Sequence, residues 1–341
     1  MKILFRVDGN SIIGWGHVMR SMSIATAAKK TGADAFFVCS DTEMQDILSE
    51  YGFRMEALYT DYRELDSETD LITKIIKEEQ PELMIIDSYF VTREYLELCS
   101  RLTKTMYVDD LFSFPYPVDY LLNYNIYASK EKYEALYGAV ETMPRLLLGP
   151  SYSPLREAFK SGRSEFREKV RNVYVSVGGS DVHGLLLKLV SEFLKDDRYK
   201  DLSFHLIMGS HEPDRGEIYA VADRDNRFRV YEKEKNVAAI MQICDLAISA
   251  AGSTLYELCA CNVPTVAFVL ADNQIEGAET FEKNEMMLCA GDIRKQGYDV
   301  GSTLERLNRL LSDIGLRKSL YDHVKAKIDG RGSDRIIEAL K

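Results

Sequence analysis

A histidine flanked by glycine and arginine lies near the start of the chain, in the segment Gly14-Trp15-Gly16-His17-Val18-Met19-Arg20. The apolar run 2–7 before it predicts a buried strand, so His17 falls in the first turn of the helix that follows. Free amides at a helix start attract anions, and an imidazole there can exchange a proton near neutral pH. His17 is therefore either a catalytic group beside an anionic ligand or a loop histidine that only caps the helix.

Two small-residue turns in the second half of the chain are further candidate sites. Gly178-Gly179-Ser180-Asp181 follows an apolar run and either lets the backbone approach a ligand or simply forms a tight turn. The turn Ser249-Ala250-Ala251-Gly252-Ser253 opens a helix whose amides suit a diphosphate. Glu257 falls one turn into that helix. Its carboxylate either accepts both hydroxyls of a ribose or closes a capping box with Ser253 or Thr254.

Other polar residues give weaker signals. Asn273-Gln274 follows an apolar run, where amide side chains can bind sugar hydroxyls or simply belong to a loop. His205 lies in an apolar run and is expected in the core. No spacing of His, Cys and carboxylate residues suggests zinc. The 6 cysteines are scattered without a C-x-x-C motif, as expected of reduced thiols in a cytoplasmic protein.

The composition restricts the possible partners. A length of 341 residues favours two domains over one. The formal net charge of -11 argues against nucleic acid or an anionic membrane as a partner, although local amides can still bind a small anion. No apolar run approaches the ~20 residues that span a bilayer, and no secretory signal is visible. We therefore expect a cytoplasmic protein without membrane insertion.

Short apolar runs alternate with amphipathic stretches, a pattern typical of parallel sheets with helices on both faces. The alternation breaks at 145–154, and a charged helix is expected over 155–169 before it resumes. We predict an α/β protein of two Rossmann-like doubly wound domains, 1–150 and 151–341, with a ligand cleft between them. The expected strands are 2–7, 35–39, 83–87, 105–108, 120–122, 173–177, 203–208, 228–231, 246–249 and 265–269. The expected helices are 17–31, 42–51, 67–80, 92–102, 183–195, 236–243, 253–261, 275–289, 303–313, 315–328 and 333–340.

The order and spacing of these motifs resemble the two-domain glycosyltransferase-B proteins. The chain is most similar to the UDP-sugar hydrolases of pseudaminic acid biosynthesis and their spore-coat polysaccharide relatives. The residues that carry the resemblance cover most of the chain: Phe5-Arg6 with Asp8, Ile13-Gly14-x-Gly16-His17-x-x-Arg20, Ile85-Ile86-Asp87-x-Tyr89, Gly178-Gly179-Ser180-Asp181, Ile248-Ser249-Ala250, Glu257 and Asn273-Gln274. The chain departs from the family at Ser88, where a histidine is frequent, and in its longer C-terminus.

The resemblance implies a glycosyltransferase-B fold and hydrolysis of UDP-2,4-diacetamido-2,4,6-trideoxy-β-L-altrose to UDP and free sugar with inversion. It implies that His17 is the base that activates water, and that Tyr89 and Asn273 line the sugar site. It implies a UDP-sugar site that includes Asp8, Gly14, Gly16, Arg20, Gly178, Gly179, Ser180, Ser249, Ala250, Gly252, Ser253, Glu257 and Gln274. No metal and no cofactor is expected.

The expected chemistry is simple because UDP leaves as a stable anion and needs no acid to protonate it, unlike an ordinary glycoside. Helix amides can neutralise the diphosphate. Arg20, one turn after His17, either contacts phosphate or forms a salt bridge. Three alternatives remain open: an inverting UDP-sugar-dependent glycosyltransferase of surface or spore-coat polysaccharide synthesis, a UDP-sugar 2-epimerase, and a binding protein without catalysis.

Overall fold

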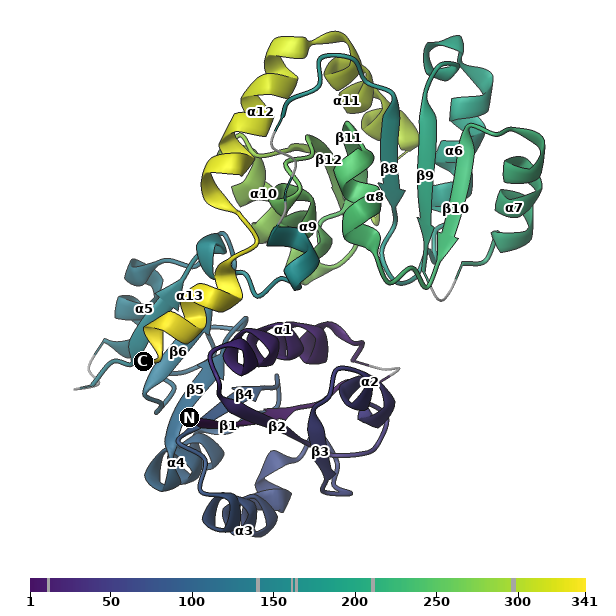
Figure 1. Ribbon diagram of the computed structural model, residues 1–341. Helices are drawn as coiled ribbons and strands as arrows, with labels where there is room; N and C mark the ends of the chain where they lie inside the picture. Colours follow the sequence, from purple (N-terminus) through teal and green to yellow (C-terminus); the bar gives the residue numbers. More distant parts are fainter. Residues whose placement is uncertain (11–12, 139–141, 161, 163–164, 210–211, 296–298) are drawn as a thin grey trace. The chain divides into compact units, whose positions relative to one another are not determined.

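The chain folds into two compact units (Figure 1). The computed structural model describes all residues except 11–12, 139–141, 161, 163–164, 210–211 and 296–298. Unit 1 comprises Met1–Glu157 together with Arg331–Lys341, and unit 2 comprises Ala158–Gly330. The predicted division into 1–150 and 151–341 needs correction, because the C-terminal segment packs with the first unit.

Unit 1 is built on seven strands in the order β3-β2-β1-β4-β5-β6-β7, and every pair is parallel. Its strands are β1 (Lys2–Val7), β2 (Asp34–Cys39), β3 (Arg54–Ala57), β4 (Leu83–Asp87), β5 (Lys104–Val108), β6 (Tyr120–Asn123) and β7 (Arg145–Leu148). Its helices are α1 (Gly16–Lys30), α2 (Gln45–Glu50), α3 (Thr69–Glu79), α4 (Arg93–Leu102), α5 (Lys130–Tyr137) and α13 (Gly332–Ala339).

The strands of unit 1 are apolar on both sides because helices cover both faces of the sheet. Leu4 and Ile86 point to the face where α3, α4 and α5 pack. On the opposite face α1 packs against β1 and β2, and α13 packs against α1. The guanidinium of Arg335 in α13 donates to the carbonyl of Ser151 at 3.1 Å. The backbones of Gly332 and Ser153 approach so closely that a side chain at Gly332 would collide.

Unit 2 is built on six strands in the order β10-β9-β8-β11-β12-β13, again all parallel. Its core joins the strands to α6, α7, α11 and α12, with Phe193 stacked on Phe204 at a centroid distance of 4.1 Å. The strands are β8 (Asn172–Ser176), β9 (Ser203–Met208), β10 (Phe228–Glu232), β11 (Leu246–Ala250), β12 (Thr265–Val269) and β13 (Leu288–Asp292). The helices are α6 (Leu185–Lys195), α7 (Arg215–Arg224), α8 (Val237–Ile243), α9 (Thr254–Ala260), α10 (Ile275–Lys283), α11 (Val300–Ser312) and α12 (Ile314–Lys327).

Each sheet has one point where the strand order reverses. In unit 1 the chain moves outward from β1 to β3 and then returns to place β4 on the other side of β1. In unit 2 it moves from β8 to β10 and returns to place β11 beside β8. Ligands of open α/β sheets bind at the carboxyl ends of the strands at such points. The His17 segment and the two small-residue turns all follow strands that border these points.

The predicted doubly wound α/β architecture is confirmed, with local exceptions. The charged helix expected over 155–169 is wrong, because the described part of that segment contains only a 3₁₀ turn at Glu157–Lys160. Phe159 is fully buried there, and Gly162 lies against the carbonyl of Ala260, so the segment follows the surface of unit 2. The helix expected over 275–289 ends at Lys283, since the edge strand β13 follows. The sequence pattern also missed the edge strands β3 and β7 and the helices α5 and α7.

Candidate active site

A glycine turn carries the chain from β1 to His17. Gly14 has a φ of 78°, which favours glycine, and its N–H donates to the carbonyl of Asn10 at 2.9 Å. The Asn10 side chain also accepts from the N–H of Ile13 at 3.0 Å. Helix α1 then begins at Gly16, and the residue before it, Trp15, makes no side-chain cap. The glycine turn, held by Asn10, therefore presents the imidazole of His17 at the carboxyl edge of the sheet.

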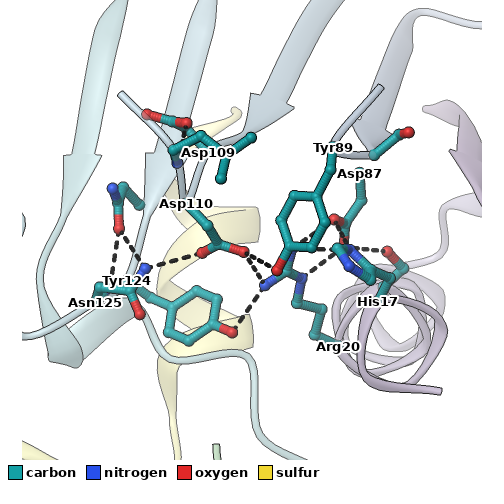
Figure 2. A network of polar contacts seen from close by, with 12 residues as sticks. His17, Arg20, Asp87, Tyr89, Asp109, Asp110, Tyr124 and Asn125 are labelled. Atoms are coloured by element: carbon teal, nitrogen blue, oxygen red, sulfur yellow. Dashed lines mark hydrogen bonds and ion pairs between the residues drawn. The ribbon is translucent and has the colours of Figure 1, made fainter. Parts of the chain in front are cut away.

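The imidazole of His17 contacts a buried carboxylate (Figure 2). Nδ1 of His17 lies 2.6 Å from Oδ1 of Asp87, the last residue of β4. Burial opposes ionisation of Asp87, but Arg20 and His17 hold its pKa well below the ordinary value. Nη2 of Arg20 also lies 3.0 Å from Nδ1, but the shorter contact is the one with the carboxylate, which accepts only. In a neutral imidazole this contact places the proton on Nδ1, and Nε2 then has the lone pair that can accept a proton. The His17 side chain is 9% exposed.

Arg20 links this pair to a second carboxylate (Figure 2). Its Nε and Nη2 donate to the two oxygens of Asp87, both at 2.6 Å. Its Nη1 donates to Oδ2 of Asp110 at 2.8 Å and to the Tyr124 hydroxyl at 2.9 Å. Burial alone would lower the pKa of Arg20, yet the two carboxylates raise it well above its usual value. Arg20 thus forms a salt bridge, and its predicted contact with phosphate stays a prediction.

Tyr89 packs beside His17. The two rings meet edge-on at a centroid distance of 4.5 Å, and the Tyr89 hydroxyl lies 3.3 Å from Oδ2 of Asp110. Burial and the charge of Asp110 raise the pKa of Tyr89, so its phenol remains protonated. The neutral hydroxyl can donate or accept a hydrogen bond. Tyr89 is therefore suited to bind a sugar substituent and unsuited to act as a base.

Asp8 lies in a separate ionic network of unit 1. Its carboxylate accepts from Arg6 at 2.5 Å and from both the N–H and the hydroxyl of Ser40 at 2.6 and 2.8 Å. Arg6 in turn donates twice to Glu68, at 2.6 and 2.8 Å. Arg6, Asp8 and Glu68 are all buried. This network holds the end of β1, from which the glycine turn departs, and a contact between Asp8 and substrate stays a prediction.

The candidate UDP residues gather at one edge of the sheet in unit 2. The strands β8, β11 and β12 are adjacent and parallel, so the turns that follow them emerge together. A side chain placed on Gly178 would lie 3.8 Å from Ala250, and one placed on Gly252 would lie 3.6 Å from Gln274. Gln274 also spans its own turn, where its Oε1 accepts from the N–H of Leu270 at 2.8 Å. The structure thus brings together three segments that are far apart in the sequence.

These residues differ in their access to solvent. The backbone or side chain is exposed at Gly179, Ser180, Ser253 and Asn273. Ser249 and Ala250 are buried, and the Ser249 hydroxyl donates to the carbonyl of Ala250 at 3.1 Å. Gly178, Gly252, Glu257 and Gln274 are partly exposed, so a ligand can reach the exposed and the partly exposed members of this set, but not Ser249 or Ala250.

Glu257 lies on α9 beside the buried phenol of Tyr174. Burial and the Glu257 charge raise the pKa of that phenol. Ser253, the residue before the helix, makes no side-chain cap, so this half of the alternative capping box is not formed. By contrast, α6 is capped by Asp181, whose carboxylate accepts from the N–H groups of Leu185 and Leu186 at 2.9 and 2.7 Å.

Residue types and spacing predicted no role for Asp87 and did not indicate Asp110, Tyr124 or Asn125. A signal for Asp110 was present, since Asp109-Asp110 follows the apolar strand β5 directly. The two carboxylates serve different purposes. Asp109 is fully buried and accepts from the Tyr116 and Tyr133 hydroxyls at 2.8 and 2.6 Å, whereas Asp110 points toward Arg20.

His205 lies in the core of unit 2, as predicted. It is fully buried on β9, with Nε2 3.1 Å from Oδ1 of Asn172 and Nδ1 3.0 Å from the Tyr231 hydroxyl. Burial and Arg229 lower its pKa to about 4. The ring is therefore neutral, donating through Nε2 and accepting through Nδ1.

Among the residues that the structure describes, no three or more His, Cys, Asp or Glu side chains are grouped so that they could hold a metal ion. None of the described helices combines the length and apolar character needed to cross a membrane.

The structure belongs to the glycosyltransferase-B class. It has two parallel-sheet units, and in each unit the candidate residues follow the strands at which the strand order reverses. The structure of MurG from Acinetobacter baumannii aligns with 99% of this chain and 98% of its own, with a TM-score of 0.72 at 10% sequence identity. Residues 173–313 match the family model of the glycosyltransferase family 28 C-terminal domain. The glycosyltransferase-B fold expected from the sequence is thus confirmed.

The chain belongs to the family of the UDP-2,4-diacetamido-2,4,6-trideoxy-beta-L-altropyranose hydrolase of Campylobacter jejuni. The two are 31% identical over 304 residues, which cover 88% of this chain and 98% of the relative. The spore coat polysaccharide biosynthesis protein SpsG of Bacillus subtilis is 25% identical over 349 residues, which cover 100% of this chain and 98% of that protein. The family resemblance carried by the motifs is confirmed.

Proposed function

We propose that the protein hydrolyses a UDP-activated acetamido-deoxy sugar of the pseudaminic acid precursor type to UDP and free sugar, with inversion. The observation that carries this proposal is the contact between His17 and Asp87, which favours the Nδ1-protonated tautomer and so assigns Nε2 of the neutral ring as the proton acceptor. Membership in a family that includes a hydrolase of such a UDP-sugar supports the substrate class.

In the proposed reaction the oxygen of a water molecule attacks the anomeric carbon while Nε2 of His17 takes one of its protons. The bond between that carbon and the diphosphate oxygen breaks, and its electron pair leaves with UDP. Asp87 stabilises the imidazolium that forms and holds the ring in the required tautomer, as the carboxylate does in hydrolytic triads. A general base typically contributes ~10²–10⁴-fold. A single displacement inverts the anomeric centre, and the stable UDP anion requires no acid, metal or cofactor.

The turns of unit 2 are the proposed UDP site. Exposed backbone at Gly179 and Ser180 and the start of α9 at Ser253 can donate N–H groups to a diphosphate. Glu257 is proposed to accept the ribose hydroxyls. Tyr89 and Asn273 are each proposed to bind the sugar.

The test is incubation of the protein with UDP-linked diacetamido-trideoxy sugars in ¹⁸O-labelled water. The proposal expects the label in the free sugar and none in UDP. It also expects the inverted anomer in NMR spectra recorded before mutarotation, and the same rate in the presence of EDTA. Label in UDP would show attack at phosphorus and refute the mechanism.

An inverting UDP-sugar-dependent glycosyltransferase of surface or spore-coat polysaccharide synthesis is the second candidate. The similarity to SpsG and the match to a glycosyltransferase family model favour it. The same incubation separates the two functions, because a transferase releases UDP only after a sugar or lipid acceptor is added. Interconversion of UDP-sugars without release would indicate an epimerase.

A further inference from the structure

Asp110 connects the elements that surround His17 (Figure 2). It follows β5 and its side chain is 13% exposed. Its Oδ2 accepts from Arg20 at 2.8 Å and from the Tyr89 hydroxyl at 3.3 Å. Its Oδ1 accepts from the side-chain amide of Asn125 at 2.8 Å. One carboxylate thus contacts groups from α1, from the segment after β4 and from the segment after β6.

Asp110 fixes the orientation of the Arg20 guanidinium. The guanidinium is a rigid planar fork, so the position of Nη1 determines where Nε and Nη2 point. Asp110 and Tyr124 hold Nη1, and the other two nitrogens therefore meet the two oxygens of Asp87. If Asp110 were removed, Nη1 would keep its contact with the neutral hydroxyl of Tyr124 but would lose its contact with a carboxylate.

The charges of the cluster favour the same arrangement. Asp87 shares Oδ1 between Nη2 of Arg20 and Nδ1 of His17, each at 2.6 Å. Arg20 is one cation between two carboxylates, so it cannot neutralise Asp87 completely. The remaining negative charge on Asp87 is available to His17 when the imidazole takes a proton.

Asp110 also restrains the other side of the imidazole. The ring of Tyr89 meets the His17 ring edge-on at 4.5 Å, and its hydroxyl donates to Asp110. The same carboxylate therefore acts on His17 by two routes, through Arg20 and Asp87 and through the ring of Tyr89.

We propose that Asp110 is a positioning residue of the reaction: it holds Arg20 and Tyr89 so that His17 keeps its proton on Nδ1 and its lone pair on Nε2. This inference rests on the proposed hydrolytic function for its kinetic consequence. Its structural consequence, the tautomer of His17, is measurable without any substrate.

The test uses the full chain with ¹⁵N-labelled histidine, which gives resonances from only 5 residues. In the unmodified protein, we expect the His17 spectrum of the Nδ1-protonated tautomer with a downfield Nδ1 proton. In Asp110→Asn, we expect a mixture of tautomers and loss of the downfield signal by exchange. With UDP-sugar, kcat should fall ~10–100-fold with little change in KM, since misplacement of a catalytic group affects the chemical step.

Three further variants make the outcome decisive. Asp110→Glu should restore part of the downfield signal and of kcat. Arg20→Lys keeps the charge but replaces the planar fork by a single nitrogen, which cannot pair with both oxygens of Asp87 while it contacts Asp110. It should therefore give the Asp110→Asn spectrum, and it serves if Asp110→Asn does not fold. Asp119→Asn is the matched control, because Asp119 is exposed and accepts from the N–H of Thr105 at the opposite edge of the same sheet. It should change neither the spectrum nor kcat.

An unchanged His17 spectrum in folded Asp110→Asn and Arg20→Lys overturns the inference, even if kcat falls, because Asp110 would then act on substrate directly. Failure of the unmodified protein to hydrolyse any UDP-sugar refutes the proposed function only. The tautomer measurement still decides the role of Asp110.

Discussion

Nδ1 of His17 lies 2.6 Å from Oδ1 of Asp87, a residue 70 positions later in the chain. The sheet produces this contact, because β1 and β4 are neighbouring parallel strands and Val7 at the end of β1 pairs in register with Asp87. The loop after β1 and the end of β4 therefore meet at the same edge. The register of β1 and β4 and the glycine turn that leads into α1 together set the geometry of the candidate base.

Replacing His17 by Asn should abolish turnover while UDP affinity survives. The amide cannot accept a proton from water as an imidazole does, and the proposed UDP residues belong to unit 2. We expect kcat to fall ~10²–10⁴-fold, the contribution of a general base. Calorimetric titration with UDP should give an unchanged Kd, and His323→Asn on α12 serves as the control. Retained turnover in His17→Asn would refute the catalytic assignment.

Replacing Asp87 by Asn should lower kcat by a similar factor with little effect on KM. An amide at this position can donate to Nδ1, which would move the imidazole proton to Nε2 and remove the base. The measurement is steady-state kinetics of the single variants and of the double variant with His17→Asn. If the two residues act as a unit, adding Asp87→Asn to His17→Asn lowers kcat little further. Multiplicative losses would show that Asp87 acts independently.

Replacing Glu257 by Ala should weaken UDP binding without affecting unit 1. Hydrogen bonds to a charged group are worth about 1.5–3 kcal/mol, so a carboxylate that accepts the ribose hydroxyls predicts roughly a tenfold or larger rise in Kd. Glu279→Ala, at an exposed position of α10, is the control. Unchanged UDP affinity in Glu257→Ala would leave Glu257 with a structural role only.

His205 should make the stability of unit 2 depend on pH. Its folded pKa of about 4 lies below the ordinary value of about 6.5, so the unfolded chain binds the proton first as pH falls. Stability is therefore complete above pH ~6.5 and declines between pH ~6.5 and ~4, by about 3 kcal/mol. Denaturant titrations that follow unit 2 should show this decline, and His205→Gln should remove it. His323→Gln should retain it, and an equal decline in both variants would contradict the assignment.

Gly332→Ala should destabilise unit 1. A methyl group there would collide with the backbone of Ser153, and such overpacking typically costs about 1–3 kcal/mol. Gly216→Ala is the matched control, since a side chain at Gly216 meets no atom within 4 Å and lies in α7. Thermal unfolding should show a lower Tm for Gly332→Ala alone. Equal Tm values for Gly332→Ala and Gly216→Ala would show that the backbone at Gly332 shifts to accommodate the methyl group without loss of stability.

Most of the long buried strands were predictable from sequence, because near-continuous apolar runs such as Leu83–Asp87 have few other structural explanations. The edge strands β3 and β13 were not, because their residues are partly exposed and interrupted by charged or small side chains. Parallel pairing also made it predictable that the turns after β8, β11 and β12 share an edge. The exact partners of Arg20 were not predictable, since sequence does not reveal which carboxylates at that edge lie within reach of its guanidinium.

The return of α13 to unit 1 has a consequence for the order of assembly. The strands of the unit that carries His17 precede unit 2 in the chain, whereas α13, which packs on α1, follows unit 2. Unit 2, by contrast, is continuous in the chain and can close as soon as it emerges. Unit 1 therefore cannot be completed during synthesis until unit 2 has been made, and a nascent chain halted between Gly330 and α13 would contain all of unit 2 and an incomplete unit 1.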